Sequence, residues 1–219
     1  MTDLYALDLK APGSRMAREA AELLRDTAGT FLYQHSHRVY HWAALRGRRK
    51  ALAFDPELLY VAAMFHDLGL IERFNTSPHR FEVDGAHAAR DFLEAHRVSR
   101  IAIDKVWLAI ALHTTPGIPE HLHPEAQLLH VGAGMDVAGR CFHEFTEEER
   151  AAVLRLHPRE EDFGPRIIDT FHDALAQRPA TTFGTFNDDF IAYRDAAFKR
   201  VDICCVILAS PWEGQRPRS

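Results

Sequence analysis

The chain has 219 residues, of which 47% are apolar and 26% are charged. This length favours one domain with appendages, and this composition excludes a mainly disordered, collagen-like or membrane-spanning chain. The chain has 26 Lys and Arg against 31 Asp and Glu, and the resulting formal charge of -5 argues against a nucleic-acid-binding surface, which would need a basic patch.

Apolar residues recur every three to four positions, and no segment convincingly alternates apolar with polar residues, so the sequence predicts an all-helical fold. Asp55, Ser99 and Thr146 are expected to cap the N-termini of helices. Polar loops are expected over residues 72–81 and 114–124. In chain order, helices are expected over residues 16–25, 30–49, 56–69, 82–96, 99–113, 125–140, 146–157, 165–177 and 188–207.

These elements are expected to form a single domain with short additions at both ends. Residues 16–160 form the main helical domain, preceded by an extension of residues 1–15. The helices within residues 161–208 are expected to pack on the same domain, where they cover the functional site or form a dimer interface. Residues 209–219 are expected to be a loose tail.

The sequence also indicates the compartment. Its first fifteen residues lack the basic stretch, apolar core and cleavage site of a secretory signal, and no apolar stretch approaches the length of a membrane span. The three cysteines are Cys141, Cys204 and Cys205, and an odd number with an adjacent pair makes a poor disulfide framework. We therefore expect a cytoplasmic protein that contacts neither membrane nor nucleic acid.

Histidine is unusually frequent, at 14 residues, and the pair His66-Asp67 lies inside a strongly apolar stretch. Two polar side chains in such a stretch are costly without partners, and successive helical residues can both reach one ion beside the helix. The pair on its own fits a buried hydrogen-bonded contact equally well.

Three further segments favour a metal site. His35 lies in the segment Tyr33-Gln34-His35-Ser36-His37-Arg38-Val39. His113 lies at the end of the helix that follows Ser99, and Asp136 has Gly and Ala as its helical neighbours. A face of small residues lets a second helix approach closely, which would bury the Asp136 carboxylate and leave it in need of a cation. A buried Asp that accepts hydrogen bonds at a helix crossing is the alternative.

Together these segments resemble the HD domain superfamily of metal-dependent hydrolases, over about residues 30 to 140. The resemblance rests on five motifs in the family's order: His35-Ser36-His37-Arg38-Val39, His66-Asp67-Leu68-Gly69, Gly85-Ala86, His113 and Asp136. It implies a single-domain helical bundle with a metal site at its centre. By this match the metal ligands are His35, His66, Asp67 and Asp136, with His37 as the alternative to His35.

Many members of that superfamily bind a second metal through two more histidines. One of them matches His113, but the other position, about four residues before the Gly-Ala pair, is Phe81. A second metal would therefore need His87 or His79 together with His113.

The segments 33–42, 65–85 and 109–113 are more specifically similar to cyanamide hydratases and their relatives, over roughly residues 30 to 160. That branch is associated with a single zinc ion and also lacks the extra histidine, in agreement with Phe81. The resemblance implies Zn²⁺ as cofactor, with Fe²⁺ and Mn²⁺ as alternatives.

A divalent metal with an open coordination position lowers the pKa of bound water from about 16 towards about 7. The resulting hydroxide is expected to attack a small, nitrile-like substrate, as in the conversion of cyanamide to urea. Asp67, Glu82 and His113 are the candidates for proton transfer, although Glu82 also fits the first turn of a helix. Phe74, Thr76 and Phe81 are expected to line a restricted substrate pocket.

Three other functions remain open from the sequence. A phosphohydrolase acting on a nucleotide or small phosphoester would need a cationic clamp, for which Arg38, Arg73 and Arg80 are available. A diiron oxygenase of the same superfamily would need six ligands. A non-catalytic binding module is disfavoured by the intact set of four ligands.

Overall fold

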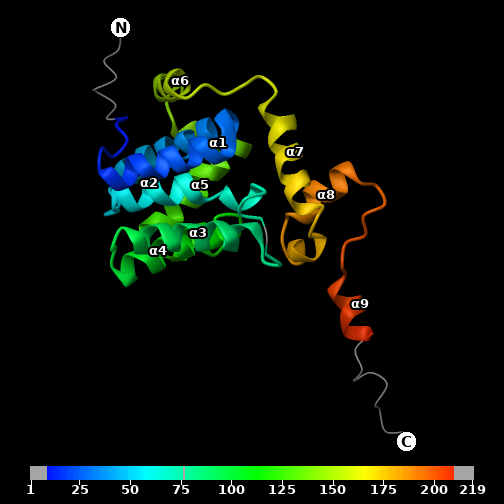
Figure 1. The fold of residues 1–219 in the computed structure, drawn as a ribbon. Coiled ribbons are helices and arrows are strands. Elements are labelled where there is room, and N and C mark those ends of the chain that lie inside the picture. The colour runs from blue at the N-terminus through cyan, green and yellow to red at the C-terminus, as the bar shows by residue number, and fades with distance from the viewer. Residues whose placement is uncertain (1–8, 76, 210–219) are drawn as a thin grey trace, which may run out of the picture.

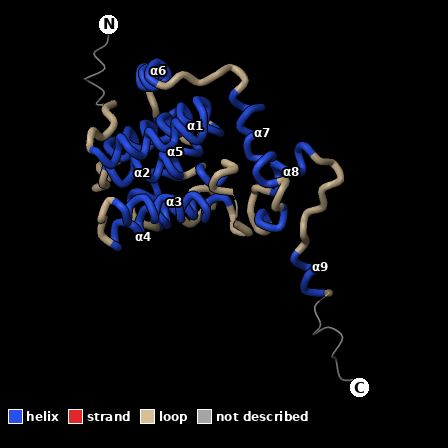
Figure 2. The backbone as a smooth tube through the Cα atoms, in the orientation of Figure 1, coloured by secondary structure: helices blue, strands red, loops and turns tan. Residues whose placement is uncertain are grey.

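The computed structural model describes residues 9–75 and 77–209, and in that part of the chain helices are joined by loops without any β-strand (Figures 1 and 2). This confirms the all-helical prediction. The α-helices are α1 Arg15–Arg49, α2 Pro56–Phe65, α3 Phe81–Ala95, α4 Arg100–Leu112, α5 Pro124–Ala138, α6 Glu147–Leu156, α7 Phe163–Leu175, α8 Asp188–Arg194 and α9 Ile203–Leu208. Four short 3₁₀ helices are η1 Leu68–Leu70, η2 Pro119–His121, η3 Phe142–Glu144 and η4 Pro179–Thr182.

The three predicted N-caps form. The Asp55 side chain accepts hydrogen bonds from the amides of residues 57 and 58, and the Ser99 side chain accepts one from the amide of residue 102. Thr146 and Glu149 exchange the two reciprocal hydrogen bonds of a capping box at the start of α6. Local sequence signals thus set these helix starts.

Four predicted helices differ from the structure. The first two are one element, α1, bent where Gly29 adopts φ 69°. The helix expected to reach Gly69 ends at Phe65, because the chain leaves α-helical geometry at Asp67 and turns into η1. The last predicted helix is split into α8 and α9, and the Asp202 side chain caps the start of α9.

The core lies around α2, whose residues from Leu58 to Phe65 are all buried against α1, α3, α4 and α5. Helices α1 and α5 cross at close range through Gly132. A Cβ atom at that glycine would lie 2.4 Å from the carbonyl oxygen of Val39. The small residues of α5 therefore let the two helices approach as the sequence predicted, and Asp136 is buried at 4% exposure.

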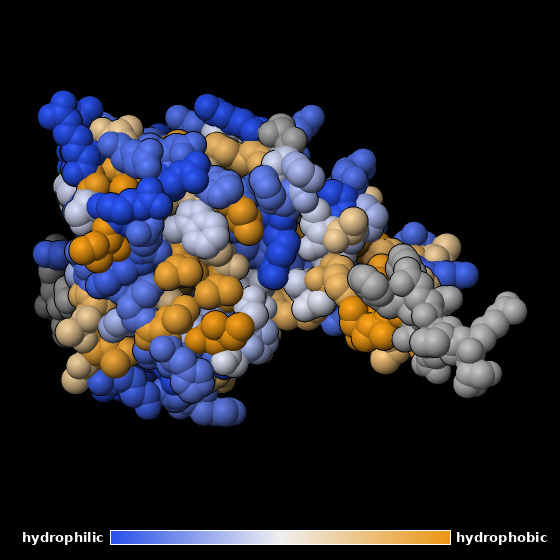
Figure 3. Space-filling model, turned by 90° about the horizontal axis from the view of Figure 1, so that it is seen from below, coloured by the Kyte–Doolittle hydropathy of each residue, from blue (hydrophilic) through white to orange (hydrophobic). Residues whose placement is uncertain are grey.

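The C-terminal helices differ in how they pack. Helix α7 packs beside η1 and α8, and its apolar residues join a second cluster that includes Phe81. Helix α9 has no buried residue and extends from the rest of the molecule (Figure 1). Apolar side chains gather on the surface of this projecting part (Figure 3), where Ile203, Ile207 and Leu208 are exposed. In the described residues, no helix is long and apolar enough to cross a membrane.

Candidate metal centre

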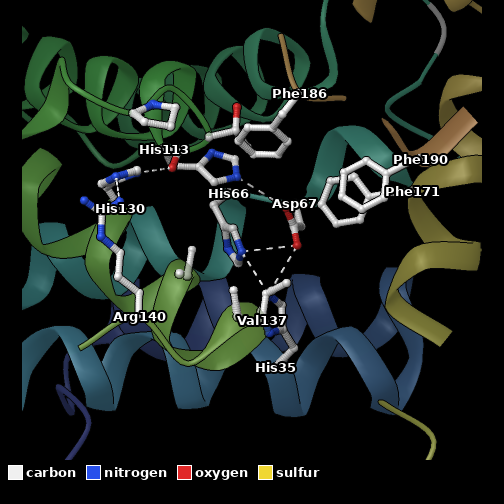
Figure 4. Close-up of a pocket in the computed structure, with 15 residues that line it drawn as sticks. His35, His66, Asp67, His113, His130, Val137, Arg140, Phe171, Phe186 and Phe190 are labelled. Atoms are coloured by element: carbon white, nitrogen blue, oxygen red, sulfur yellow. Dashed lines mark hydrogen bonds and ion pairs between the residues drawn. The ribbon is translucent and has the colours of Figure 1, made fainter. Parts of the chain in front are cut away.

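Two histidines and a carboxylate converge where α1 passes the end of α2 (Figure 4). The Nε2 atoms of His35 and His66 are 3.2 Å apart, and the Oδ2 atom of Asp67 lies 3.4 Å from the first and 3.2 Å from the second. All three side chains are at most 3% exposed. Within residues 9–75 and 77–209, this is the group of His, Cys, Asp and Glu with metal-binding spacing.

The backbone around His66 and Asp67 is held by two close glycine contacts. A Cβ atom at Gly85 would lie 2.7 Å from the Phe65 carbonyl oxygen, and one at Gly69 would lie 1.9 Å from the Phe81 carbonyl oxygen. The first contact brings α3 against the end of α2, and the second brings α3 against η1. The glycines of the two sequence motifs therefore fix where the His66-Asp67 pair leaves the helix.

Hydrogen bonds at the opposite ring nitrogens fix the histidine tautomers. The Nδ1 atom of His66 bonds the Ala63 carbonyl at 2.8 Å, and that of His113 bonds the Ile110 carbonyl at 2.7 Å. Because a carbonyl oxygen only accepts, both Nδ1 atoms carry the proton and both Nε2 atoms present a lone pair. Such bonds to the outer nitrogen are typical of metal-ligating histidines.

This arrangement fits a cation. The Oδ1 atom of Asp67 is buried without a hydrogen-bond partner, and its Oδ2 atom faces two imidazoles. A buried carboxylate oxygen without a partner is costly, whereas a divalent ion bound here would satisfy it together with the two Nε2 atoms. His35, His66 and Asp67 are the residues that can hold it.

The electrostatics around Asp67 follow from burial and charge pairing. Burial favours the neutral carboxyl, but His66, His113 and His35 together hold the pKa of Asp67 well below its ordinary value. Burial also opposes the charge on His35, yet hydrogen bonds to Asp136 and Asp67 raise its pKa to about 9. For His66, burial dominates and lowers the pKa. Asp67 is therefore anionic at neutral pH.

Asp136 lies behind His35 and not among the three converging atoms. Its Oδ2 atom accepts from Nδ1 of His35 at 2.7 Å, and Arg38 donates to both of its oxygens at 2.8 Å. The Trp42 indole donates to Oδ1 at 3.0 Å. Burial would raise the pKa of Asp136, but His35 and Arg38 lower it. In this arrangement Asp136 orients the His35 ring, as an outer carboxylate does in metal sites.

His113 stands at the edge of the group. Its Nε2 atom lies 3.6 Å from Oδ1 of Asp67, and its ring centroid lies 5.0 Å from that of His66. The structure thus brings His113 within reach of the unpartnered oxygen of Asp67.

Glu82 is fully buried, but its Oε1 atom is already occupied. It accepts hydrogen bonds from Arg80 at 2.8 Å, from Asn187 at 3.0 Å and from the Thr114 hydroxyl. Burial would raise the pKa of Glu82, but Arg80, His113 and Thr114 together lower it. Glu82 does not line the cavity at the metal centre. Its contacts instead connect α3 to the segments that carry Thr114 and Asn187.

The structure brings the remaining predicted residues to different places. His87 faces Trp107 and His79, at ring distances of 5.9 and 5.8 Å, and shares a separate cavity with Phe74. Phe81 lies beside the site, with its ring 5.7 Å from that of His113. Thr76 lies outside the described residues.

A cavity of about 350 Å³ opens onto the metal centre (Figure 4). Its lining includes residues that the sequence reasoning missed: His130, Arg140, Phe171, Phe186 and Phe190. The His130 Nδ1–H donates to the His113 carbonyl at 2.6 Å, and its Nε2 atom accepts from Arg140. His130 could have been proposed from the sequence, because it lies six residues before Asp136 on the same helix. Phe171, Phe186 and Phe190 lie far along the chain, and no sequence pattern places them at the cavity.

Comparisons with known proteins agree with this geometry. The HD domain family matches residues 32–162, which is more than half of the chain and includes His35, His66, Asp67, His113 and Asp136. No curated protein matches the chain.

Proposed function

The chain belongs to the HD domain family, which generally comprises metal-dependent hydrolases, and we propose that it adds water to a small uncharged substrate of the nitrile type. Family membership gives the coarser function, a metal-dependent hydrolase-type activity. The observation that carries the proposal is the convergence of two imidazole Nε2 atoms and a carboxylate at a cavity with mostly apolar walls.

We further propose a single divalent metal ion, Zn²⁺ first and Fe²⁺ or Mn²⁺ as alternatives. Bound at this centre, such an ion would lower the pKa of a water molecule towards neutrality and so supply a hydroxide nucleophile. His35, His66 and Asp67 offer three ligand atoms, which leaves coordination positions open on the cavity side. His87 lies in a different cavity, so the geometry supports one metal over a diiron centre.

His113, which lies beside Asp67, is the residue placed to transfer protons in the proposed reaction. Nδ1 of His113 is committed to the Ile110 carbonyl, so its Nε2 atom can accept a proton and return it. This atom also faces the free oxygen of Asp67, which stabilises the protonated ring. In the proposed reaction a water oxygen bonds to the nitrile carbon while one C–N π bond breaks and a proton reaches the nitrogen. The resulting imidic acid then passes its O–H proton to the nitrogen, which gives an amide, or urea when the substrate is cyanamide.

The contacts that the arginine side chains make favour an uncharged substrate over a phosphoester. Arg38 is bound to Asp136 and Arg80 to Glu82, while the Arg73 guanidinium lies over the Phe74 ring. Arg140 lines the cavity but forms an ion pair with Glu120 at 2.7 Å. A phosphate would therefore find no free cationic clamp in this lining.

The test starts from protein stripped with a chelator and reloaded separately with Zn²⁺, Fe²⁺ or Mn²⁺. Cyanamide, acetonitrile and p-nitrophenyl phosphate are then assayed side by side, with Asp67→Asn as the inactive control. We expect metal-dependent formation of urea or amide that saturates at about one ion per chain. Metal-dependent turnover of the phosphate ester alone would contradict the proposal, as would equal activity in stripped protein.

A further inference from the structure

We propose that three phenylalanines, Phe171, Phe186 and Phe190, form an aromatic wall that selects substrates carrying a flat apolar group such as a phenyl ring. The inference rests on the proposed function, because it names the substrate class of the same site. It also assigns a role to the C-terminal segment, since all three residues lie beyond the part of the chain that the family matches.

The wall is continuous with the metal centre. The rings of Phe171 and Phe190 stack at 4.3 Å between centroids and 12° between planes. Phe171 meets the edge of Phe81 at 5.4 Å, and Phe81 meets the edge of His113 at 5.7 Å. In Figure 4 Phe171 and Phe190 lie on the side of Asp67 away from His130 and Arg140, and Phe186 lies beside His113. A substrate whose reacting carbon lies at the metal centre can therefore rest its other end on aromatic rings.

Buried polar contacts hold this segment in place. The Asn187 amide, 1% exposed, donates to Glu82 at 3.0 Å, next to Phe186 in the chain. At the end of α7, Arg178 donates to the Gly69 carbonyl at 2.8 Å and pairs with Asp84. These bonds tie the wall to α3 and η1, the elements that also position His66 and Asp67. A preorganised wall binds without the cost of ordering a loop.

The cavity is larger than a nitrile group requires. Its volume of about 350 Å³ compares with roughly 30 Å³ for one water in the liquid, and it lies at the lower end of the range for organic ligands. Val137, Ala138 and Pro116 add further apolar side chains to the lining. Phe186 is 42% exposed, so a bound ring would remove aromatic surface from water. Size and lining both point to an aryl-bearing, uncharged substrate.

Binding of benzonitrile to the zinc-loaded protein, measured by titration calorimetry or NMR, tests the wall without requiring turnover. We expect benzonitrile to bind more tightly than acetonitrile or phenyl phosphate. Phe186→Ala should weaken benzonitrile binding by about five- to tenfold, the worth of one aromatic contact, and leave acetonitrile binding unchanged. The matched control is Phe183→Ala, a nearby phenylalanine that is 45% exposed and lines other cavities. It should change the dissociation constant by less than about twofold.

Two results would overturn the inference: phenyl phosphate binding more tightly than benzonitrile, or equal benzonitrile affinities in wild type, Phe186→Ala and Phe190→Ala. Because Phe186 is partly exposed, its variant is expected to fold, and circular dichroism checks this. A different result would contradict the proposed function but not the aromatic wall. In that case benzonitrile binds with the expected dependence on Phe186, but neither it nor cyanamide is converted with any of the three metals.

Discussion

Helix α1 carries histidines of two clusters that differ in their partners. His35 faces Asp67 and Asp136, whereas His37 and His41 stack against His157, with ring centroids 4.5 and 5.1 Å apart. His37 bonds the Tyr33 carbonyl through Nδ1 and accepts from the Tyr60 hydroxyl through Nε2. We refer to His35, His66 and Asp67 as the metal cluster and to His37, His41 and His157 as the stacked cluster.

Neighbouring carboxylates determine whether a buried histidine in this protein carries a charge. Burial lowers the pKa of His41 to about 4 and that of His157 to about 3, with other cationic groups adding to the shift. His35 is at least as deeply buried, yet its two carboxylate partners raise its pKa to about 9. Side chains two positions apart on a helix point about 200° apart, so one helix serves both clusters.

The largest expected effect, on metal content, comes from replacing one α1 histidine of each cluster by alanine in separate variants. His35→Ala removes one of three converging ligand atoms, so bound metal and metal-dependent activity should both be lost. His41→Ala makes the same change on the same helix and should keep the metal. Metal analysis and circular dichroism of the two purified variants check this. Equal metal contents in the two variants would break the distinction between the clusters.

The next effect concerns Asp136, which connects the metal cluster to Arg38. Asp136→Asn leaves the buried guanidinium of Arg38 without a carboxylate, and the loss of such a partner costs about 3–5 kcal/mol. The His35 ring also loses its orienting acceptor, so metal affinity should fall about 10- to 100-fold. Urea denaturation and a metal titration measure the two effects separately. A variant that folds normally but binds no metal at all would instead make Asp136 a direct ligand.

The stacked cluster should make stability depend on acidity. The unfolded chain binds protons near pH 6.5, whereas folded His41 resists protonation until about pH 4. Stability from this group is therefore fully present above about pH 6.5 and is lost as the pH falls towards 4. Between pH 7 and pH 5 the loss is on the order of 2 kcal/mol. Urea denaturation at the two pH values should show a smaller loss in His41→Phe; an unchanged loss would mean that other groups carry it.

A smaller effect is expected where α1 and α5 cross. Gly132→Ala would push a methyl group against the Val39 carbonyl and should destabilise the protein by about 1–2 kcal/mol. Gly134, on the same helix, is the control, because a Cβ there meets only the flexible Arg140 side chain. Gly134→Ala should be neutral or slightly stabilising, since alanine favours a helix. Thermal unfolding of both variants gives the comparison, and equal shifts would exclude a special role for the Gly132 contact.

The sequence predicted what depends on local pattern. Thr146 with Glu149 predicted the start of α6, and the apolar stretch around His66-Asp67 predicted a buried pair. The small residues near Asp136 predicted the close helix crossing. Each of these signals is contained within a few residues, so no knowledge of the tertiary structure was needed.

Features that depend on tertiary contacts could not be predicted. Asp136 bonds the outer nitrogen of His35 because Arg38 and Trp42 hold it there, and these residues come from another helix. Phe171 and Phe190 reach the cavity only because Arg178 and Asn187 tie the C-terminal segment to α3. The break between α8 and α9 was missed because the apolar spacing continues across residues 195–202, although those residues do not form a helix.

The most direct test of the account is to count metal ions per chain in protein purified without added metal or chelator. The geometry of the metal cluster predicts about one divalent ion per chain in the wild type and none in His35→Ala, with His41→Ala like the wild type. Two irons per chain in the wild type would contradict the single-metal centre and favour an oxygenase. Protein that binds no metal even after incubation with Zn²⁺, Fe²⁺ or Mn²⁺ would contradict the metal centre itself.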